Sequence, residues 1–165
     1  MGNNPFATLK PKSIWLHKAS GLICDIPPNV LERRTGQYHH FDSQSEYSMY
    51  KRLCMNCPQV TVTRNHKLVL LPKTVRFKEL AWKVDFGIAL APMLVPSIFL
   101  EFKGAYILHS SFNKEALHLR LAMAERVMLS SDRLYIVTDN PPTDIGHGYR
   151  THTTASIISL IKGLL

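Results

Sequence analysis

Apolar residues along the chain follow two spacings, and each spacing predicts one type of element. A spacing of three or four residues places side chains on one face of a helix, and it predicts helices over 43–56, 113–129 and 154–164. Runs of β-branched and aliphatic residues predict strands over 60–63, 67–71, 80–90, 98–103 and 133–138, with a turn at Arg64-Asn65-His66. The segment 143–152, which contains His147, Tyr149 and Arg150, is expected to connect elements or to grip DNA.

The order of these elements predicts an α/β fold. A helix, a set of strands, a second helix, a further strand and a last helix indicate a mixed, mostly antiparallel sheet flanked by helices, with a crossover after Lys103. The first helix starts with the capping-box pattern Ser43-Gln44-Ser45-Glu46. Residues 1–40 are rich in Pro, Lys and Asn and are expected to form an irregular N-terminal arm or small subdomain. Residues 41–165 are then one core with a C-terminal helix.

Composition narrows the choice of partner and compartment. The 20 Lys and Arg against 12 Asp and Glu give a formal net charge of +8, which favours a polyanionic partner, and nucleic acid is the default. No apolar run reaches the roughly 18 residues that span a bilayer, so no membrane partner is expected. The 3 cysteines, an odd number, argue against a disulfide framework and favour the reducing cytoplasm.

Two apolar, strand-like runs carry acidic residues that indicate a chemical site. Asp85 lies in the first run, and Glu101 and Lys103 lie in the second. Side chains alternate along a strand, so Glu101 and Lys103 share a face. If the two runs pair as a hairpin, Asp85 comes to lie beside Glu101. Two carboxylates and an ammonium would then suit a divalent cation and a polarised water.

The same residues carry a resemblance to a known family. The pattern Ser43-x-x-Glu46, then Val84-Asp85-Phe86, then Leu100-Glu101-Phe102-Lys103-Gly104 resembles that of the PD-(D/E)XK nuclease superfamily. In that family a helix with a Glu precedes a hairpin presenting D…(D/E)-x-K, followed by a helix and a strand. The resemblance covers residues 41–139, and the usual proline before the aspartate is Val84 here. It implies a restriction-endonuclease-like core with the order α-β-β-β-α-β.

The resemblance also implies roles for individual residues. Asp85 and Glu101 would ligate Mg²⁺, or Mn²⁺ as a substitute, with the Phe102 carbonyl, and Glu46 would complete the site. Lys103 would orient the attacking water and stabilise charge on the phosphate. The expected protein is a DNA endonuclease and homodimer of the phage, intron or transposon kind. It is expected to be a homing endonuclease or a transposon-end nuclease that cleaves both strands at a specific site, and a resolvase of Holliday junctions or branched DNA is the alternative. Further DNA contacts are expected from Lys83, Lys114, Arg120, Arg33 and Arg34.

Plainer interpretations of these residues stay open. Glu46 can serve only to cap its helix, and the charges at 85, 101 and 103 can be the solvent-facing positions of a strand. Cys54-x-x-Cys57 would need Cys24 with His39 or His40 to hold zinc, so reduced thiols are favoured. A non-catalytic nucleic-acid-binding protein on the same fold, or a nuclease acting on RNA, also fits the sequence.

Overall fold

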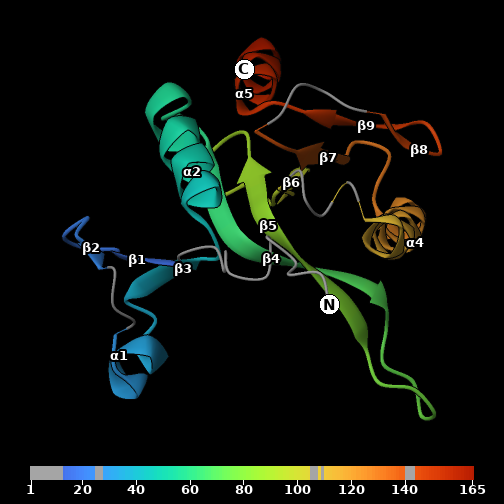
Figure 1. The fold of residues 1–165 in the computed structure, drawn as a ribbon, viewed down its shortest axis with the longest axis horizontal. Coiled ribbons are helices and arrows are strands. Elements are labelled where there is room, and N and C mark those ends of the chain that lie inside the picture. The colour runs from blue at the N-terminus through green and yellow to red at the C-terminus, as the bar shows by residue number, and fades with distance from the viewer. Residues whose placement is uncertain (1–12, 25–27, 105–107, 109, 140–143) are drawn as a thin grey trace, which may run out of the picture. The chain divides into compact units, whose positions relative to one another are not determined.

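The chain consists of two structural units, which are divided between Lys51 and Arg52. The computed structural model describes residues 13–24, 28–104, 108, 110–139 and 144–165 (Figure 1). The dividing point lies inside helix α2 (Gln44–Asn56), later in the chain than the expected boundary after residue 40. Each unit is described on its own below.

Unit 1 contains a small antiparallel sheet with the strand order β2-β1-β3. Its elements are β1 (Ile14–His17), β2 (Ile23–Cys24), α1 (Val30–Arg34) and β3 (Tyr38–Phe41). The expectation of an irregular segment over residues 1–40 is therefore wrong for its described part. Strands of two to four residues are too short to show a repeating pattern, and their pairing between distant residues defines them.

The start of α2 follows the predicted capping pattern with one shift. Ser43 Oγ accepts a hydrogen bond from Glu46 N at 3.1 Å, as in a capping box. The Glu46 carboxylate accepts from Asp42 N at 2.8 Å, one residue before the position that a capping box uses. Phe41, which precedes this cap, is fully buried, and its ring lies 5.2 Å from those of Tyr47 and Tyr50.

Unit 2 is built on a six-stranded sheet with the order β4-β5-β6-β7-β9-β8. The strands are β4 (Thr61–Leu71), β5 (Leu80–Ala89), β6 (Ile98–Phe102), β7 (Arg133–Val137), β8 (Asp144–Gly146) and β9 (Tyr149–His152). The pairs β4–β5, β5–β6 and β8–β9 are antiparallel, while β6–β7 and β7–β9 are parallel. This confirms a mixed, mostly antiparallel sheet with a crossover after β6.

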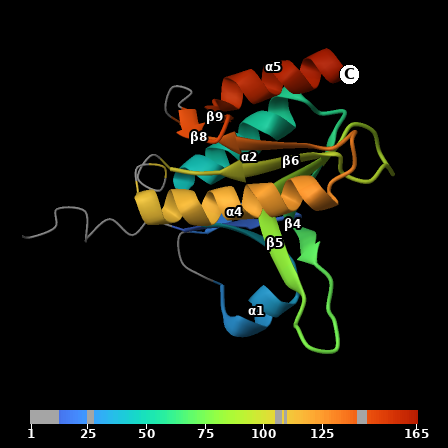
Figure 2. The ribbon, with the colours of Figure 1, turned by 90° about the vertical axis from the view of Figure 1, so that its right-hand side faces the viewer.

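Two helices of unit 2 flank this sheet. Helix α4 (Ser111–Val127) makes the crossover from β6 to β7, and α5 (Thr154–Leu164) follows β9 (Figure 2). Leu117 and Leu121 of α4 join a buried cluster with Phe99 and Ile136, and the alternate strand positions Leu100 and Val137 are fully buried too. Both faces of the central strands are therefore covered. No helix within the described ranges is long and apolar enough to cross a membrane.

Two local predictions for unit 2 are wrong. The expected turn at residues 64–66 lies inside the continuous strand β4, because Arg64 and His66 pair with Phe86 and Val84 of β5. The expected loop over 143–152 contains the hairpin of β8 and β9 within its described part. That hairpin closes through three residues with positive φ, Gly146 (98°), His147 (53°) and Gly148 (80°). Strands of three and four residues are again too short for sequence periodicity to show.

Candidate metal centre in the fork between two strands

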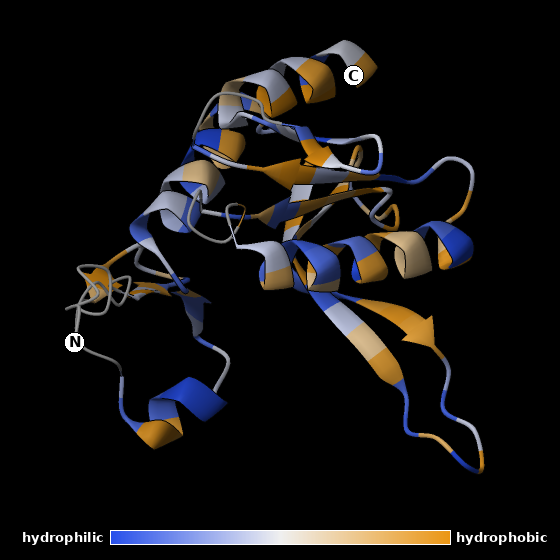
Figure 3. Ribbon diagram, turned by 45° about the vertical axis from the view of Figure 1, so that its right-hand side comes forward, coloured by the Kyte–Doolittle hydropathy of each residue, from blue (hydrophilic) through white to orange (hydrophobic). Residues whose placement is uncertain are grey.

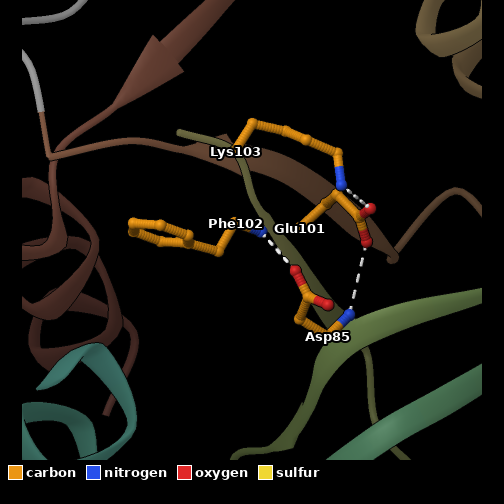
Figure 4. Close-up of polar contacts among 4 residues, drawn as sticks. All are labelled: Asp85, Glu101, Phe102 and Lys103. Carbon is orange, nitrogen blue, oxygen red and sulfur yellow. Dashed lines mark hydrogen bonds and ion pairs between the residues drawn. The ribbon is translucent and has the colours of Figure 1, made fainter. Parts of the chain in front are cut away.

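The candidate site lies where β5 and β6 stop pairing through their backbones. Their ladder runs from Ile88 opposite Ile98 to Phe86 opposite Leu100. Asp85 and Glu101 occupy the next position on the two strands, and there the side chains take over the hydrogen bonding (Figure 4). We call the group of Asp85, Glu101, Lys103 and the Phe102 backbone N–H the fork.

Each carboxylate of the fork accepts a backbone N–H from the opposite strand. Asp85 Oδ2 accepts from Phe102 N at 2.7 Å, and Glu101 Oε2 accepts from Asp85 N at a longer 3.3 Å. Buried N–H groups need partners, and separating strands leave theirs without a ladder bond. The carboxylates therefore hold the diverging strands, which also fixes the two acids next to each other. The predicted convergence of Asp85 and Glu101 is confirmed.

Lys103, which directly follows the end of β6, completes the fork. Its Nζ contacts Glu101 Oε1 as an ion pair, while Asp85 contributes no atom to that contact (Figure 4). The Glu101 side chain is 4 % exposed and that of Lys103 is 18 % exposed, so the pair is largely removed from water. The lysine thus neutralises one of the two carboxylates and places a positive charge at the fork.

Burial and crowding of negative charge change the acidity of Asp85. Burial of its carboxyl group is the largest cause, and the charge of Glu101 is the second, and together they raise the pKa of Asp85 from 3.8 to about 7. Lys103, the hydrogen bond from Phe102 and the charge of Arg64 act in the opposite direction but are outweighed. A cation would relieve the same repulsion that a proton relieves near neutral pH.

The regular alternation of side chains along strand β5 is interrupted near Asp85. Gly87 pairs with Phe99, so the two share a face, and Phe99 belongs to the buried cluster that also contains Val84. Val84 and Gly87 are three residues apart, and regular alternation would place them on opposite faces. The alternation therefore slips once between them, in the stretch that contains Asp85. Because of this slip, β5 has residues on the same buried face both before and after Asp85.

Asn65 of β4 has a backbone conformation that accompanies this slip. Its neighbours Arg64 and His66 pair with Phe86 and Val84, so Asn65 stands opposite Asp85 by register. Asn65 has φ 50°, in the left-handed region that asparagine tolerates better than most residues. The residue type therefore suits the irregular position next to the fork.

Substitution of Asn65 tests this conformational requirement. Asn65→Gly should change the free energy of unfolding by less than about 0.5 kcal/mol, because glycine adopts positive φ freely. Asn65→Val should lower it by about 1–2 kcal/mol, because a β-branched side chain is strained there. Urea denaturation of the two purified variants measures both values. Equal losses would show that the asparagine side chain, not its backbone conformation, matters.

Arg64 is a neighbour of the fork that the sequence did not reveal. Its charge lowers the pKa of Asp85, and its guanidinium carbon lies 5.6 Å from the centre of the Phe86 ring. The expected turn at residues 64–66 hid its place on a strand. No local sequence signal identified Arg64, because asparagine at the next position favours a turn.

The remaining predicted site residues lie outside the fork. Glu46 is 4 % exposed and belongs to unit 1, where its carboxylate caps α2, so its part in the metal site stays a prediction. Lys83 and Arg120 are exposed, and Lys114 is half-buried. In unit 1, Arg34 is exposed and the Arg33 guanidinium lies 5.8 Å from the centre of the Trp15 ring.

The cysteines and histidines form no second candidate metal site in the described part of the chain. Cys24, Cys54 and Cys57, all within the described ranges, form no disulfide, and of the three only Cys57 is buried. Across the described ranges, no group of three or more His, Cys, Asp or Glu side chains could hold a metal ion on its own. A site at the fork would therefore use two carboxylates together with backbone oxygen and water.

Comparisons with known proteins leave the family open. Neither protein-family models, nor curated proteins, nor solved structures gave a match to this chain.

Proposed function

We propose that the chain is a divalent-metal-dependent endonuclease that hydrolyses phosphodiester bonds of DNA at the fork. The observation that supports this most is the convergence of Asp85 and Glu101 in a largely buried place with one lysine on Glu101. Buried like charges are costly unless a cation or a proton offsets them. A structure that keeps two such acids together is therefore suited to binding a cation.

The chemistry of the fork fits Mg²⁺, with Mn²⁺ as a substitute. Hard cations take oxygen ligands, and Mg²⁺ keeps several of its waters, so few protein ligands suffice. Asp85, Glu101 and the Phe102 carbonyl would hold the ion, and waters would complete its ligand set. When bound, the ion would offset the negative charge that develops at the scissile phosphate.

The residues of the fork then have separate tasks in cleavage. Glu101 positions the Lys103 ammonium through their ion pair, so the lysine keeps a fixed place at the site. Lys103 orients the attacking water and stabilises charge on the phosphate. Asp85, whose pKa is raised to about 7, would serve as a cation ligand in its deprotonated form. Arg64 adds positive charge on the side of Asp85.

The element order supports the same proposal at the level of the fold. The succession α2, β4, β5, β6, α4 and β7 follows the order of the PD-(D/E)XK core. Asp85 lies on the second of these strands, Glu101 lies on the third, and Lys103 directly follows the third. We propose that the chain shares this restriction-endonuclease-like core. Site-specific cleavage of both DNA strands, as in homing or transposon enzymes, would require two such sites and hence a homodimer. Resolution of branched DNA is the alternative.

Digestion of defined substrates tests the proposed reaction. The purified protein should convert supercoiled plasmid to nicked and linear forms with Mg²⁺ and leave it intact with EDTA. Linear duplex, a four-way junction and an RNA of the same sequence, offered at one salt concentration, identify the preferred substrate. If all four substrates remain uncleaved with both Mg²⁺ and Mn²⁺, the proposal is contradicted. If RNA alone is cleaved, RNA and not DNA is the substrate.

A further inference from the structure

The antiparallel pair β4–β5 continues well beyond the part of the sheet that contains the fork. Strand β6 pairs with residues 86–88 of β5 only, whereas β4 and β5 remain paired out to Leu71 and Leu80. We call residues 66–84 the arm, and Figures 1 and 3 show its tip reaching past the other strands of unit 2. Lys83, on the arm, is two residues from Asp85, a distance of about 7 Å along a strand.

One face of the arm's base is fixed by packing. Leu68, Leu70 and Trp82 are buried in the cluster that includes Leu117 and Leu121 of α4. Successive side chains on a strand alternate in direction. The strand neighbours of these three residues, such as Lys67 and Val69 on β4 and Lys83 on β5, therefore point away from α4. The arm is thus anchored on one face and open on the other.

The arm concentrates positive charge on its open side and at its tip. Between residues 67 and 83 there are five cations and one acid, a net charge of +4 out of the +8 of the whole chain. All five cations are exposed, namely Lys67, Lys73, Arg76, Lys78 and Lys83. Lys67 stands directly opposite Lys83 in the ladder, a like-charge pair that costs stability. Glu79 offsets part of this cost by an ion pair with Lys67 at 2.5 Å.

The tip of the arm presents apolar side chains from a closed turn. Thr74 N donates to Phe77 O at 3.0 Å, and Phe77 N donates to Thr74 Oγ1 at 3.1 Å, so the turn has a defined shape. Within it, Val75 is 106 % exposed and Phe77 is 73 % exposed. Two exposed apolar residues flanked by three cations suit a partner that offers both anionic groups and apolar surface.

We propose that the arm is a nucleic-acid grip that enters a groove of duplex DNA beside the bond to be cleaved. A two-stranded antiparallel ribbon fits the major groove, which is about 12 Å wide. The five cations contact phosphates, and Val75 and Phe77 make apolar contact with base edges or steps inside the groove. Because the arm and Asp85 share strand β5, the grip sets the distance between bound DNA and the fork. This inference rests on DNA being the substrate of the proposed nuclease.

Binding of a labelled DNA duplex in EDTA tests the grip without any cleavage. Arg76→Gln/Lys78→Gln removes two arm cations and should weaken binding about tenfold at moderate salt, with a salt slope reduced by about 1.8. The control Arg126→Gln/Lys162→Gln removes the same two residue types from exposed helix ends and should bind like wild type. Val75→Ser/Phe77→Ser should weaken binding several-fold with an unchanged salt slope, because it alters no charge.

The outcomes distinguish the proposed DNA-binding role of the arm from the proposed nuclease activity. If both arm variants bind DNA as wild type does while wild type still cleaves, the grip is refuted and the nuclease stands. Equal weakening by the arm and control pairs would also refute it, since total charge would then explain the effect. DNA binding that depends on the arm without cleavage in Mg²⁺ would support the contact between arm and DNA and refute the nuclease. A protein that binds no duplex at all would overturn the grip, and the cleavage assay on all four substrates then decides the nuclease.

Discussion

Lys103→Gln should lower the rate of DNA cleavage about 10³-fold while leaving duplex affinity in EDTA within about threefold of wild type. Glutamine keeps much of the side chain's length and can still donate to Glu101, but it removes the positive charge from the fork. The charge is needed where negative charge develops on the phosphate, and binding relies on other cations. Single-turnover cleavage of plasmid and anisotropy of a labelled duplex measure the two quantities.

Lys162→Gln provides the matched control for this result. Lys162 is exposed near the end of α5 and lies outside the fork and the arm, so its loss should leave cleavage unchanged. Urea denaturation of Lys103→Gln is needed as well, because weakening a buried ion pair lowers stability. A folded Lys103→Gln protein that cleaves as fast as wild type would remove the lysine from the proposed chemistry.

Asp85→Asn should abolish cleavage and at the same time stabilise the metal-free protein above pH 7. The pKa of Asp85 is about 7 in the folded protein, whereas the ordinary value, which applies to the unfolded chain, is 3.8. Between these two pH values the folded state therefore holds a proton that the unfolded state has lost. The contribution of this group to stability is therefore largest at acidic pH and falls as pH rises from about 4 to about 7. Asparagine removes that loss, which is on the order of 4 kcal/mol for a pKa difference of about three units.

The free energy of unfolding at about pH 5 and about pH 8 measures this effect. Asp85→Asn should exceed wild type by a larger margin at the basic value than at the acidic value, where less of the contribution has been lost, and Mg²⁺ should stabilise wild type only. Asparagine can still accept the hydrogen bond from Phe102, so little structure is lost. A variant less stable than wild type at pH 8 would mean that the Asp85 carboxylate serves mainly to hold the two strands.

Local sequence signals predicted the elements that carry the site. The cap at Ser43, the apolar stripe of the helix after the crossover and the acids placed inside apolar runs each depend on residues close together in the chain. The paired convergence of Asp85 and Glu101 followed from alternation and an assumed hairpin alone. These features were predictable because short-range geometry determines them.

Other features depend on contacts that no local pattern encodes. In the sheet of unit 1, the short strand β1 pairs with β3, which follows it only after β2 and helix α1, so only the folded chain defines this pairing. Asn65 was expected in a turn because asparagine favours turns, whereas in β4 its left-handed conformation is accommodated inside a paired strand. The hydrogen bonds from backbone N–H groups to the two carboxylates arise where the strands diverge, and sequence gives no position for that divergence.

Calorimetric titration of the protein with Mn²⁺ in two buffers of different ionisation enthalpy tests the central claim, that the fork binds a divalent cation, most directly. At about pH 6 wild type should bind the ion and release close to one proton, mainly from Asp85, and at about pH 8 it should bind more tightly with little proton release. Asp85→Asn and Glu101→Gln should each lose this binding. Binding of equal strength in wild type and both variants, or no binding at millimolar Mn²⁺, would contradict the account.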